Sequence, residues 1–342
     1  MATRKTPAYT PRWLYRFFAF LESLPIPLWA LGLSIILFGG LAMHLDAWNK
    51  GLVPVGQYNG YLATVSLFNV GYLALWIFLD RRARLAVKDF FQNRGKSQAE
   101  VEAIYADFIS LPPLPANLAF LGGTLFGYLG LPFAMRLQPL VGKVLPLWDL
   151  ISWLPISGLI FMLLYRIIRQ AFLLPRFFRA IDVDIFNPSP IYAISRYTSQ
   201  VSIVLLIINY GLVFSSLPTM LSTSFGFLYQ VFIIGPSLIY FFAPLASINQ
   251  RMRKEKENLL FNIGEAQKKI NAKLLVSVSS KKYTDLAELR NAVTALKEQR
   301  EVLQKLTTRP WQSDTLRNLL APLTLPIFVY LIQRYLGTLF GF

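Results

Sequence analysis

The chain has 342 residues, of which 54% are hydrophobic and only 15% charged, with a net charge of +16 and no cysteine. Soluble domains carry about 25% charged residues, so this composition excludes an ordinary soluble domain, a disordered chain and a disulfide-stabilised secreted scaffold. The apolar residues occur in long blocks, which predicts an all-α fold, a polytopic membrane helix bundle.

Seven apolar stretches are long enough to cross a bilayer, for which a helix needs about 20 mainly apolar residues. They predict a bundle of about seven spans at residues 26–45, 58–79, 118–137, 147–165, 201–220, 224–245 and 319–340. We assign residues 1–248 to a transmembrane bundle that holds the first six spans.

The basic residues indicate how the bundle is oriented. Thirty of the 34 Lys and Arg residues lie in the N-terminal tail and in the segments after spans 2, 4 and 6, whereas four lie on the opposite side. Because cytoplasmic loops are enriched in Lys and Arg, we expect the N-terminus inside, the C-terminus outside and most basic loops in the cytoplasm. The same rule accounts for the net positive charge, so we expect no nucleic-acid partner.

Residues 11–24 combine Arg12 and Arg16 with Trp13, Phe17 and Phe18 ahead of the first span. This pattern is compatible with an amphipathic helix in the inner interface. A basic aromatic flank of the first span explains it equally well.

Two shorter segments are expected on the inner face. Residues 81–116 predict one or two amphipathic helices that end at a run of prolines. Residues 176–196 form an elbow in which the prolines at 188 and 190 predict a kinked loop, with the helix resuming at 195–198. Its charged residues predict ion pairs that hold the elbow, or alternatively a cation or ligand site: Arg179, Asp182, Asp184 and Arg196.

Residues 249–309 predict a cytoplasmic antiparallel hairpin of two helices, with 310–342 returning to the membrane as the seventh span. Asp285 and Glu288 have the spacing of a capping box for the second helix. Apolar residues recur at steps of three, four and seven, which places them on one stripe of each helix. The stripe either joins the two helices or also binds a partner, and its residues are Leu259, Ile263, Ile270, Leu274, Leu286, Leu289, Val293, Leu296 and Leu303.

The sequence contains no metalloprotease, CxxC, GxSxG or Walker pattern, so we expect no enzyme activity, no cofactor and no metal. His44 is interpreted as a hydrogen-bonded polar side chain near the outer end of span 1. Gly123 and Gly127 have the small-xxx-small spacing of helices that pack closely. Six residues within spans are candidates for helix packing or for a polar lining: Asn69, Asn209, Gln230, Gly235, Pro236 and Pro326.

Residues 242–260, 309–336 and 184–198 together resemble an uncharacterised group of bacterial multi-pass membrane proteins. The resemblance implies a bacterial inner (plasma) membrane and no known activity. Seven spans, an inner N-terminus and long inner helices before the last span are also similar to insect odorant and gustatory receptors. Those receptors are ligand-gated cation channels, and their C-terminal signature is missing from this chain.

These patterns lead to three hypotheses about function. The first is a non-enzymatic multi-pass membrane protein whose cytoplasmic hairpin mediates assembly with itself or with a membrane-protein partner. The second is a homo-oligomeric ion channel, gated by a ligand or not, with a pore from spans 5–7. The third is a membrane enzyme or lipid-handling protein that uses the aromatic-rich inner interface and the elbow at Asp182 and Asp184. In each case the lipid bilayer and anionic inner-leaflet lipids are expected partners.

Overall fold

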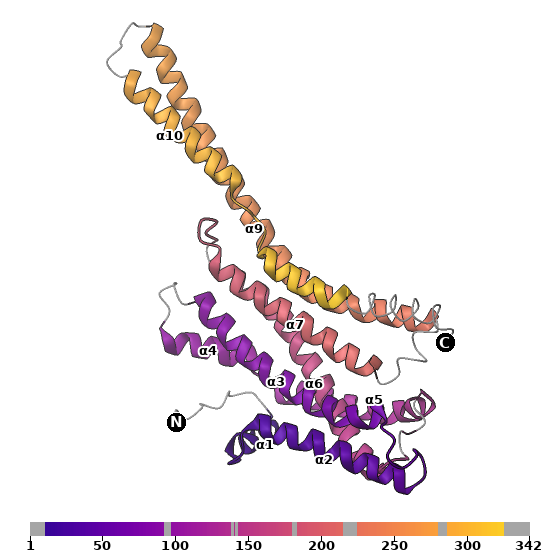
Figure 1. Cartoon of the computed structure of the whole chain (residues 1–342). Coiled ribbons are helices and arrows are strands. Elements are labelled where there is room, and N and C mark those ends of the chain that lie inside the picture. The colour runs from indigo at the N-terminus through magenta and orange to yellow at the C-terminus, as the bar shows by residue number, and fades with distance from the viewer. Residues whose placement is uncertain are drawn as a thin grey trace.

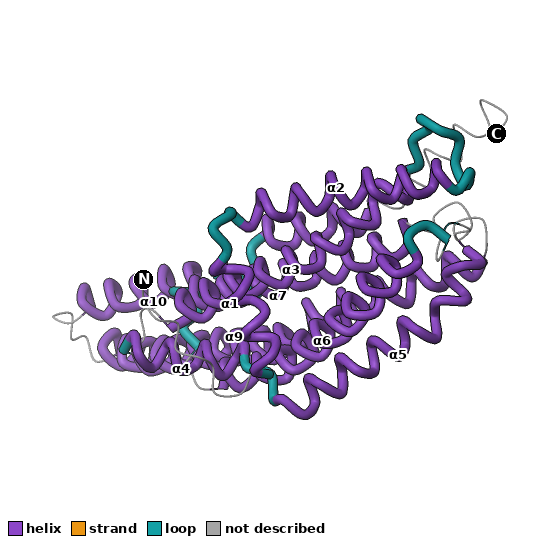
Figure 2. Tube along the Cα trace, turned by 90° about the horizontal axis from the view of Figure 1, so that it is seen from below, coloured by secondary structure: helices purple, strands orange, loops and turns teal. Residues whose placement is uncertain are grey.

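Helices form every regular element in the described part of the chain, which comprises residues 11–91, 97–137, 140, 143–179, 183–214, 224–279 and 286–324 of a computed structural model. This confirms the prediction of an all-α chain. The helices form a bundle from which one helical pair projects (Figure 1), and no strand interrupts the described trace (Figure 2).

Five helical stretches among the described residues are long and apolar enough to cross a membrane, so the chain has the composition of a helical membrane protein. Large apolar side chains are exposed on two of these stretches: Phe38 (72% exposed) on the first, and Leu129 (67% exposed) on the third. Exposed apolar side chains of this kind are what a lipid-facing surface requires. The predicted spans at 224–245 and 319–340 lie partly outside the described side chains, so a total of seven stays a prediction. The five stretches are Leu28–Asn49, Gly60–Phe91, Gln98–Pro132, Trp153–Arg179 and Ser189–Ile208.

α1 (Arg12–Ser23) is a separate helix ahead of α2 (Leu28–Asn49), as expected for an amphipathic interface helix. Its Leu14 side chain is 2% exposed, and Trp13 Nε1 donates a hydrogen bond to Asn117 Oδ1 at 3.0 Å. The Phe18 ring stacks on Trp76 with the ring centroids 6.0 Å apart. These contacts fasten α1 to the bundle rather than leaving it as a simple flank of the first span.

α3 (Gly60–Phe91) and α6 (Pro146–Arg179) continue well past residues 79 and 165, where their spans were predicted to end. At 1.5 Å per residue they are about 48 and about 51 Å long, whereas the hydrocarbon core is about 30 Å thick. Asp80 and Arg166 each follow the first residue of their helix by 20 positions, or about 30 Å. Both charges therefore lie about one hydrocarbon thickness along their helices.

α5 (Pro113–Leu137) packs closely against α6 because glycines line the contact. A Cβ atom at Gly123 would lie 2.6 Å from the Ser157 carbonyl oxygen, and one at Gly127 would lie 2.6 Å from Ser157 Oγ. Gly158 of α6 is similarly close to Thr124 Oγ1 of α5, at 2.6 Å. The predicted packing role of Gly123 and Gly127 is confirmed.

α7 (Ser189–Phe214) lies at the centre of the bundle, and 72% of its apolar candidate span, Ser189–Ile208, is buried. It packs against α3 and α9. The prediction that the helix resumes only at 195–198 is wrong, because α7 already begins at Ser189 and Tyr197 is 1% exposed. Pro190 occupies the first turn, where a helix tolerates proline because the missing N–H has no intrahelical partner there.

α9 (Ser224–Ser279) is a single helix of 56 residues that contains both the predicted sixth span and the first half of the predicted hairpin. The domain boundary predicted at residue 248 thus falls inside a continuous helix. α10 (Leu286–Lys305) packs along the far half of α9 in the opposite direction, and the pair extends beyond the bundle (Figure 1). The residues between them, which include Asp285, lie outside the described chain.

Candidate functional site

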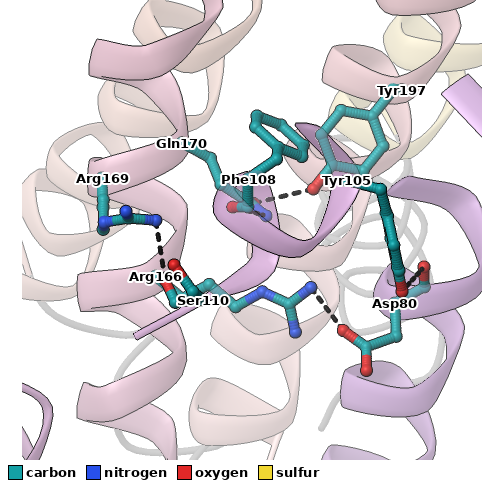
Figure 3. Close-up of polar contacts among 8 residues, drawn as sticks. All are labelled: Asp80, Tyr105, Phe108, Ser110, Arg166, Arg169, Gln170 and Tyr197. Atoms are coloured by element: carbon teal, nitrogen blue, oxygen red, sulfur yellow. Dashed lines mark hydrogen bonds and ion pairs between the residues drawn. The ribbon is translucent and has the colours of Figure 1, made fainter. Parts of the chain in front are cut away.

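A polar cluster surrounds Asp80 and Arg166, about 30 Å along α3 and α6. Arg166, Arg169 and Gln170 lie on one face of α6 because they are three and four residues apart. α3 contributes Asp80, α4 (Gln98–Ile109) contributes Tyr105 and its C-terminal carbonyl groups, and α7 contributes Tyr197 (Figure 3). Four helices thus meet in one network.

The centre of the cluster is an ion pair between Asp80 and Arg166. Arg166 Nη2 lies 2.5 Å from Asp80 Oδ1, and the arginine side chain is 2% exposed against 27% for the aspartate. The guanidinium carbon also lies 5.5 Å from the centre of the Trp76 ring, a cation–π contact. Arg166 Nε has no hydrogen-bond partner, so Asp80 supplies most of the compensation for burying this charge.

Arg169 fastens α4 by its C-terminus. Its Nη1 donates hydrogen bonds to the carbonyl oxygens of Asp107 (3.0 Å) and Ser110 (2.6 Å), and Nη2 lies 3.5 Å from Asp107 Oδ1. The last carbonyl groups of a helix lack intrahelical partners and carry partial negative charge, so a cation there is stabilising. The N-terminus of α4 is held separately, by a capping box between Ser97 and Glu100.

Gln170 joins α4, α6 and α7. Its Oε1 accepts a hydrogen bond from the Tyr197 hydroxyl at 2.7 Å, while its Nε2 donates to the Phe108 carbonyl oxygen at 3.4 Å. Both Gln170 and Tyr197 are 1% exposed. Because buried polar groups cost free energy unless they are paired, this arrangement favours one relative position of the three helices.

The contacts of the cluster each join two of the four helices. Within the described ranges, no group of three His, Asp or Glu side chains has the arrangement of a metal site. The cluster therefore fixes α3, α4, α6 and α7 against one another.

Asp80 and Arg166 were not among the residues predicted from the sequence, because they follow the predicted span ends at 79 and 165 by one residue. Arg166 was counted only as a basic residue of the segment between spans 4 and 5, and Asp80 was not considered. One signal in the sequence could have identified this pair. Asp80 and Arg166 are opposite charges at the predicted inner ends of two spans, and Arg166 is followed by Arg169 and Gln170 on the same helix face.

A second feature is an open groove of about 710 Å³ between α9 and α10, close to the bundle. All nine residues of the predicted assembly stripe are buried or half-buried, with Leu303 only 3% exposed. Apolar side chains remain exposed at this groove, including Phe186 (61%) and Val302 (55%). The groove is lined by Phe186, Leu259, Asn262, Ile263, Ala266, Ala295, Leu296, Glu298, Gln299, Val302 and Leu303.

The base of this helical pair is held by Lys256 of α9. Its ammonium group donates hydrogen bonds to the carbonyl oxygens of Gln304 (2.8 Å) and Leu306 (2.7 Å), where α10 ends. The cation again meets unpaired carbonyl groups at a helix C-terminus. The groove therefore has a defined end next to the bundle.

The elbow before α7 does not use Asp184 as an ion-pair partner within the described residues. Asp184 Oδ1 instead accepts hydrogen bonds from the backbone N–H groups of Phe186 (2.8 Å) and Asn187 (3.3 Å), which shapes the turn. Arg179 and Arg196 are exposed, and Asp182 lies outside the described residues. Among the described residues, Asp184 therefore shapes a local turn, and the predicted ion pairs and cation site of the elbow stay predictions.

The candidate polar or packing residues within spans are not brought together by the described structure. Asn69 is half-buried in α3, and α9 continues as a helix through half-buried Gly235 and exposed Pro236. Among the described atoms, a Cβ atom at Gly235 would meet nothing within 4 Å, so a packing role for this glycine stays a prediction. The side chains of Asn209 and Gln230, and all of Pro326, lie outside the described residues.

His44 is a hydrogen-bonded polar side chain, as expected. It is 8% exposed, with Nδ1 2.8 Å from the Gly40 carbonyl oxygen and Nε2 accepting a hydrogen bond from the Asn59 N–H at 3.1 Å. These contacts assign the proton to Nδ1, and both ring nitrogens are used.

Comparison of the chain with protein-family models, with curated proteins and with solved structures finds no match. The resemblance to a bacterial membrane-protein group therefore stays a prediction.

Proposed function

We propose that this chain is a non-enzymatic, multi-pass membrane protein that holds a partner through the groove between α9 and α10. The observation that carries the proposal is the exposure of Phe186 and Val302 at this apolar groove. Large apolar side chains that remain exposed outside the hydrocarbon typically mark a protein interaction surface. The polar cluster at Asp80 and Arg166 would keep the bundle rigid beneath it.

The expected placement is seven spans with the N-terminus inside, the C-terminus outside and the α9–α10 pair in the cytoplasm of a bacterial cell. The distribution of 30 basic residues against four supports this orientation. The antiparallel hairpin and its stripe then belong to the cytoplasmic side, where soluble or membrane-bound partners can reach the groove.

The charge of the helical pair favours one class of partner. Residues 249–309 carry 14 basic and seven acidic side chains. Two such helical pairs repel each other, whereas a partner with an acidic amphipathic helix would place apolar residues in the groove and its carboxylates near the basic side chains elsewhere on the pair. We therefore favour a membrane-protein partner of this kind over a second copy of the chain.

The test compares two substitutions on α10 that add the same charge. Val302→Asp places a carboxylate in the groove, whereas Thr294→Asp places one at an exposed position that does not line it. Complexes are extracted gently from native membranes and their masses measured against the 38.9 kDa of one chain. We expect the wild type and Thr294→Asp to retain a larger complex that Val302→Asp loses.

Two results would contradict the proposal. One is a wild-type protein that is a lone monomer, and the other is a Val302→Asp complex as stable as that of Thr294→Asp. A homogeneous complex of identical chains that Val302→Asp disrupts would keep the groove as the interface but replace the acidic partner by a second copy. It would also favour the channel hypothesis, whose pore residues could then be sought in spans 5–7.

A further inference from the structure

The chain returns from α10 to the bundle through residues 306–312 and a helix at 313–324. The Trp311 ring packs against Phe241 and Phe242 of α9, with centroid distances of 5.8 and 5.7 Å. Thr315 is 5% exposed and Leu319 is fully buried, and Ser199 of α7 donates a hydrogen bond to the Thr315 carbonyl oxygen at 3.3 Å. This helix is therefore docked firmly on α7 and α9.

A hollow of about 370 Å³ opens beside this docked helix. Arg309, Ser313 and Arg317 supply its polar side, while Trp311, Leu316 and Leu320 supply an apolar one. Ser313, Arg317 and Leu320 follow one another at steps of four and three, so they lie on the same face of the helix. On this face the polar Ser313 and the cationic Arg317 are followed, about 5 Å further along the helix, by the apolar Leu320.

The two arginines of the hollow are available to an anion. Neither Arg309 nor Arg317 forms an ion pair with any carboxylate of the described residues, and both side chains are exposed. Asp314 lies in the first turn of the same helix but does not line the hollow. Two guanidinium groups and a hydroxyl group form a donor set that matches a phosphate group, to which arginine can donate two parallel hydrogen bonds.

The position of the hollow points to a lipid as the source of that phosphate. Trp311 packs on Phe241 and Phe242, which lie near the end of the predicted span 224–245, and tryptophan is enriched at membrane–water interfaces. The helix at 313–324 overlaps the start of the predicted span 319–340, and that span would put its polar end among the headgroups and its apolar end beside the acyl chains. A soluble phosphate would use the arginines but not Leu316 and Leu320.

We propose that this hollow binds the phosphate headgroup of an anionic phospholipid through Arg309, Ser313 and Arg317, with an acyl chain along Leu316 and Leu320. The site is independent of the groove between α9 and α10 and of the partner proposed for it. It lies at the junction of the helical pair and the bundle, so a bound lipid would brace the last helix where it returns to the membrane.

The test titrates the full-length protein in neutral detergent with phosphatidylglycerol, or with phosphatidylcholine of the same chains, and counts bound lipids by native mass spectrometry. The double variant R309Q/R317Q is compared with R290Q/R300Q, which removes two exposed arginines of α10 far from the hollow. We expect the wild type and R290Q/R300Q to prefer phosphatidylglycerol, and R309Q/R317Q to lose about tenfold in its affinity.

Three results would overturn the proposal. Equal binding of the two lipids by the wild type would remove the role of the anionic headgroup. An equal loss in both double variants would reduce the effect to overall charge, and displacement of the lipid by millimolar inorganic phosphate would make this a free-phosphate site. If R309Q/R317Q does not fold, R309K/R317K serves instead: it keeps the charge, and retention of full affinity would refute the bidentate contact.

Discussion

Replacing Asp80 by asparagine removes the carboxylate that lies 2.5 Å from Arg166 Nη2. The guanidinium group, 2% exposed and packed over Trp76, would then be a buried charge without a counter-ion. Removing one partner of a buried pair costs about 3–5 kcal/mol. We expect the lower value, about 3 kcal/mol, because the 27% exposure of Asp80 lets water reach the vacated position.

The free energy of unfolding can be measured in mixed micelles by titrating sodium dodecyl sulfate into neutral detergent and following far-UV circular dichroism. Glu102→Gln is the matched control, because its ion pair with Arg84 spans 3.7 Å between side chains that are about half exposed. Such a surface pair contributes less than about 1 kcal/mol. The double variant Asp80→Leu with Arg166→Met removes both charges and should recover most of the stability lost in Asp80→Asn.

The reasoning is refuted if Asp80→Asn and Glu102→Gln lose the same free energy of unfolding. The explanation also fails if the double variant is less stable than Asp80→Asn. In that case the stability lost in Asp80→Asn would come from the loss of the ion pair itself and not from an unpaired buried arginine.

Two further substitutions test the helix contacts by the same unfolding measurement. Gly123→Ala should lower the free energy of unfolding by about 1–3 kcal/mol, because its Cβ atom would lie 2.6 Å from the Ser157 carbonyl oxygen and force α5 away from α6. Gly122→Ala is the control and should leave the free energy of unfolding unchanged, because its Cβ atom would meet nothing within 4 Å. Equal effects of the two alanines would contradict the close packing. Ser97→Ala should lower the free energy of unfolding by about 1 kcal/mol, because Ser97 Oγ accepts a hydrogen bond from the Glu100 N–H. The same change should speed hydrogen exchange in the first turn of α4. Unchanged exchange there would exclude the capping box as a stabilising element.

Individual helices could be predicted well from the sequence, because the hydropathy pattern that indicates them is local. The apolar stretches at 26–45, 58–79, 118–137 and 147–165 all lie largely within observed helices, and the spacing of Gly123 and Gly127 predicted a close contact. The start of α7 was predicted six residues late, because prolines at 188 and 190 were interpreted as preventing a helix. In the first turn they do not, since no intrahelical N–H bond is lost there.

The candidate site was less predictable. The stripe from Leu259 to Leu303 was predicted from its periodicity, and its residues are half-buried on α9 and α10 except for Leu303, which is buried. The ion pair of Asp80 and Arg166 was missed, because a charge one residue beyond a span has the same hydropathy whether it faces water or another helix. The exposed Phe186 belongs to the groove only because the elbow brings it beside α9 and α10.

Hydropathy, charge distribution and helical periodicity are properties of short segments, so they are enough to predict that this chain is helical and that several of its segments are apolar enough to span a membrane. Which segments become neighbours depends on the packing of whole helices, on close contacts such as the one at Gly123, and on how far α3 and α6 extend beyond their predicted spans. The contact of Asp80 with Arg166, and the presence of Arg309 and Arg317 at the same hollow, can be seen in the folded chain alone. Burial of a charge and convergence of two cations are relations between distant residues, and no local pattern encodes them.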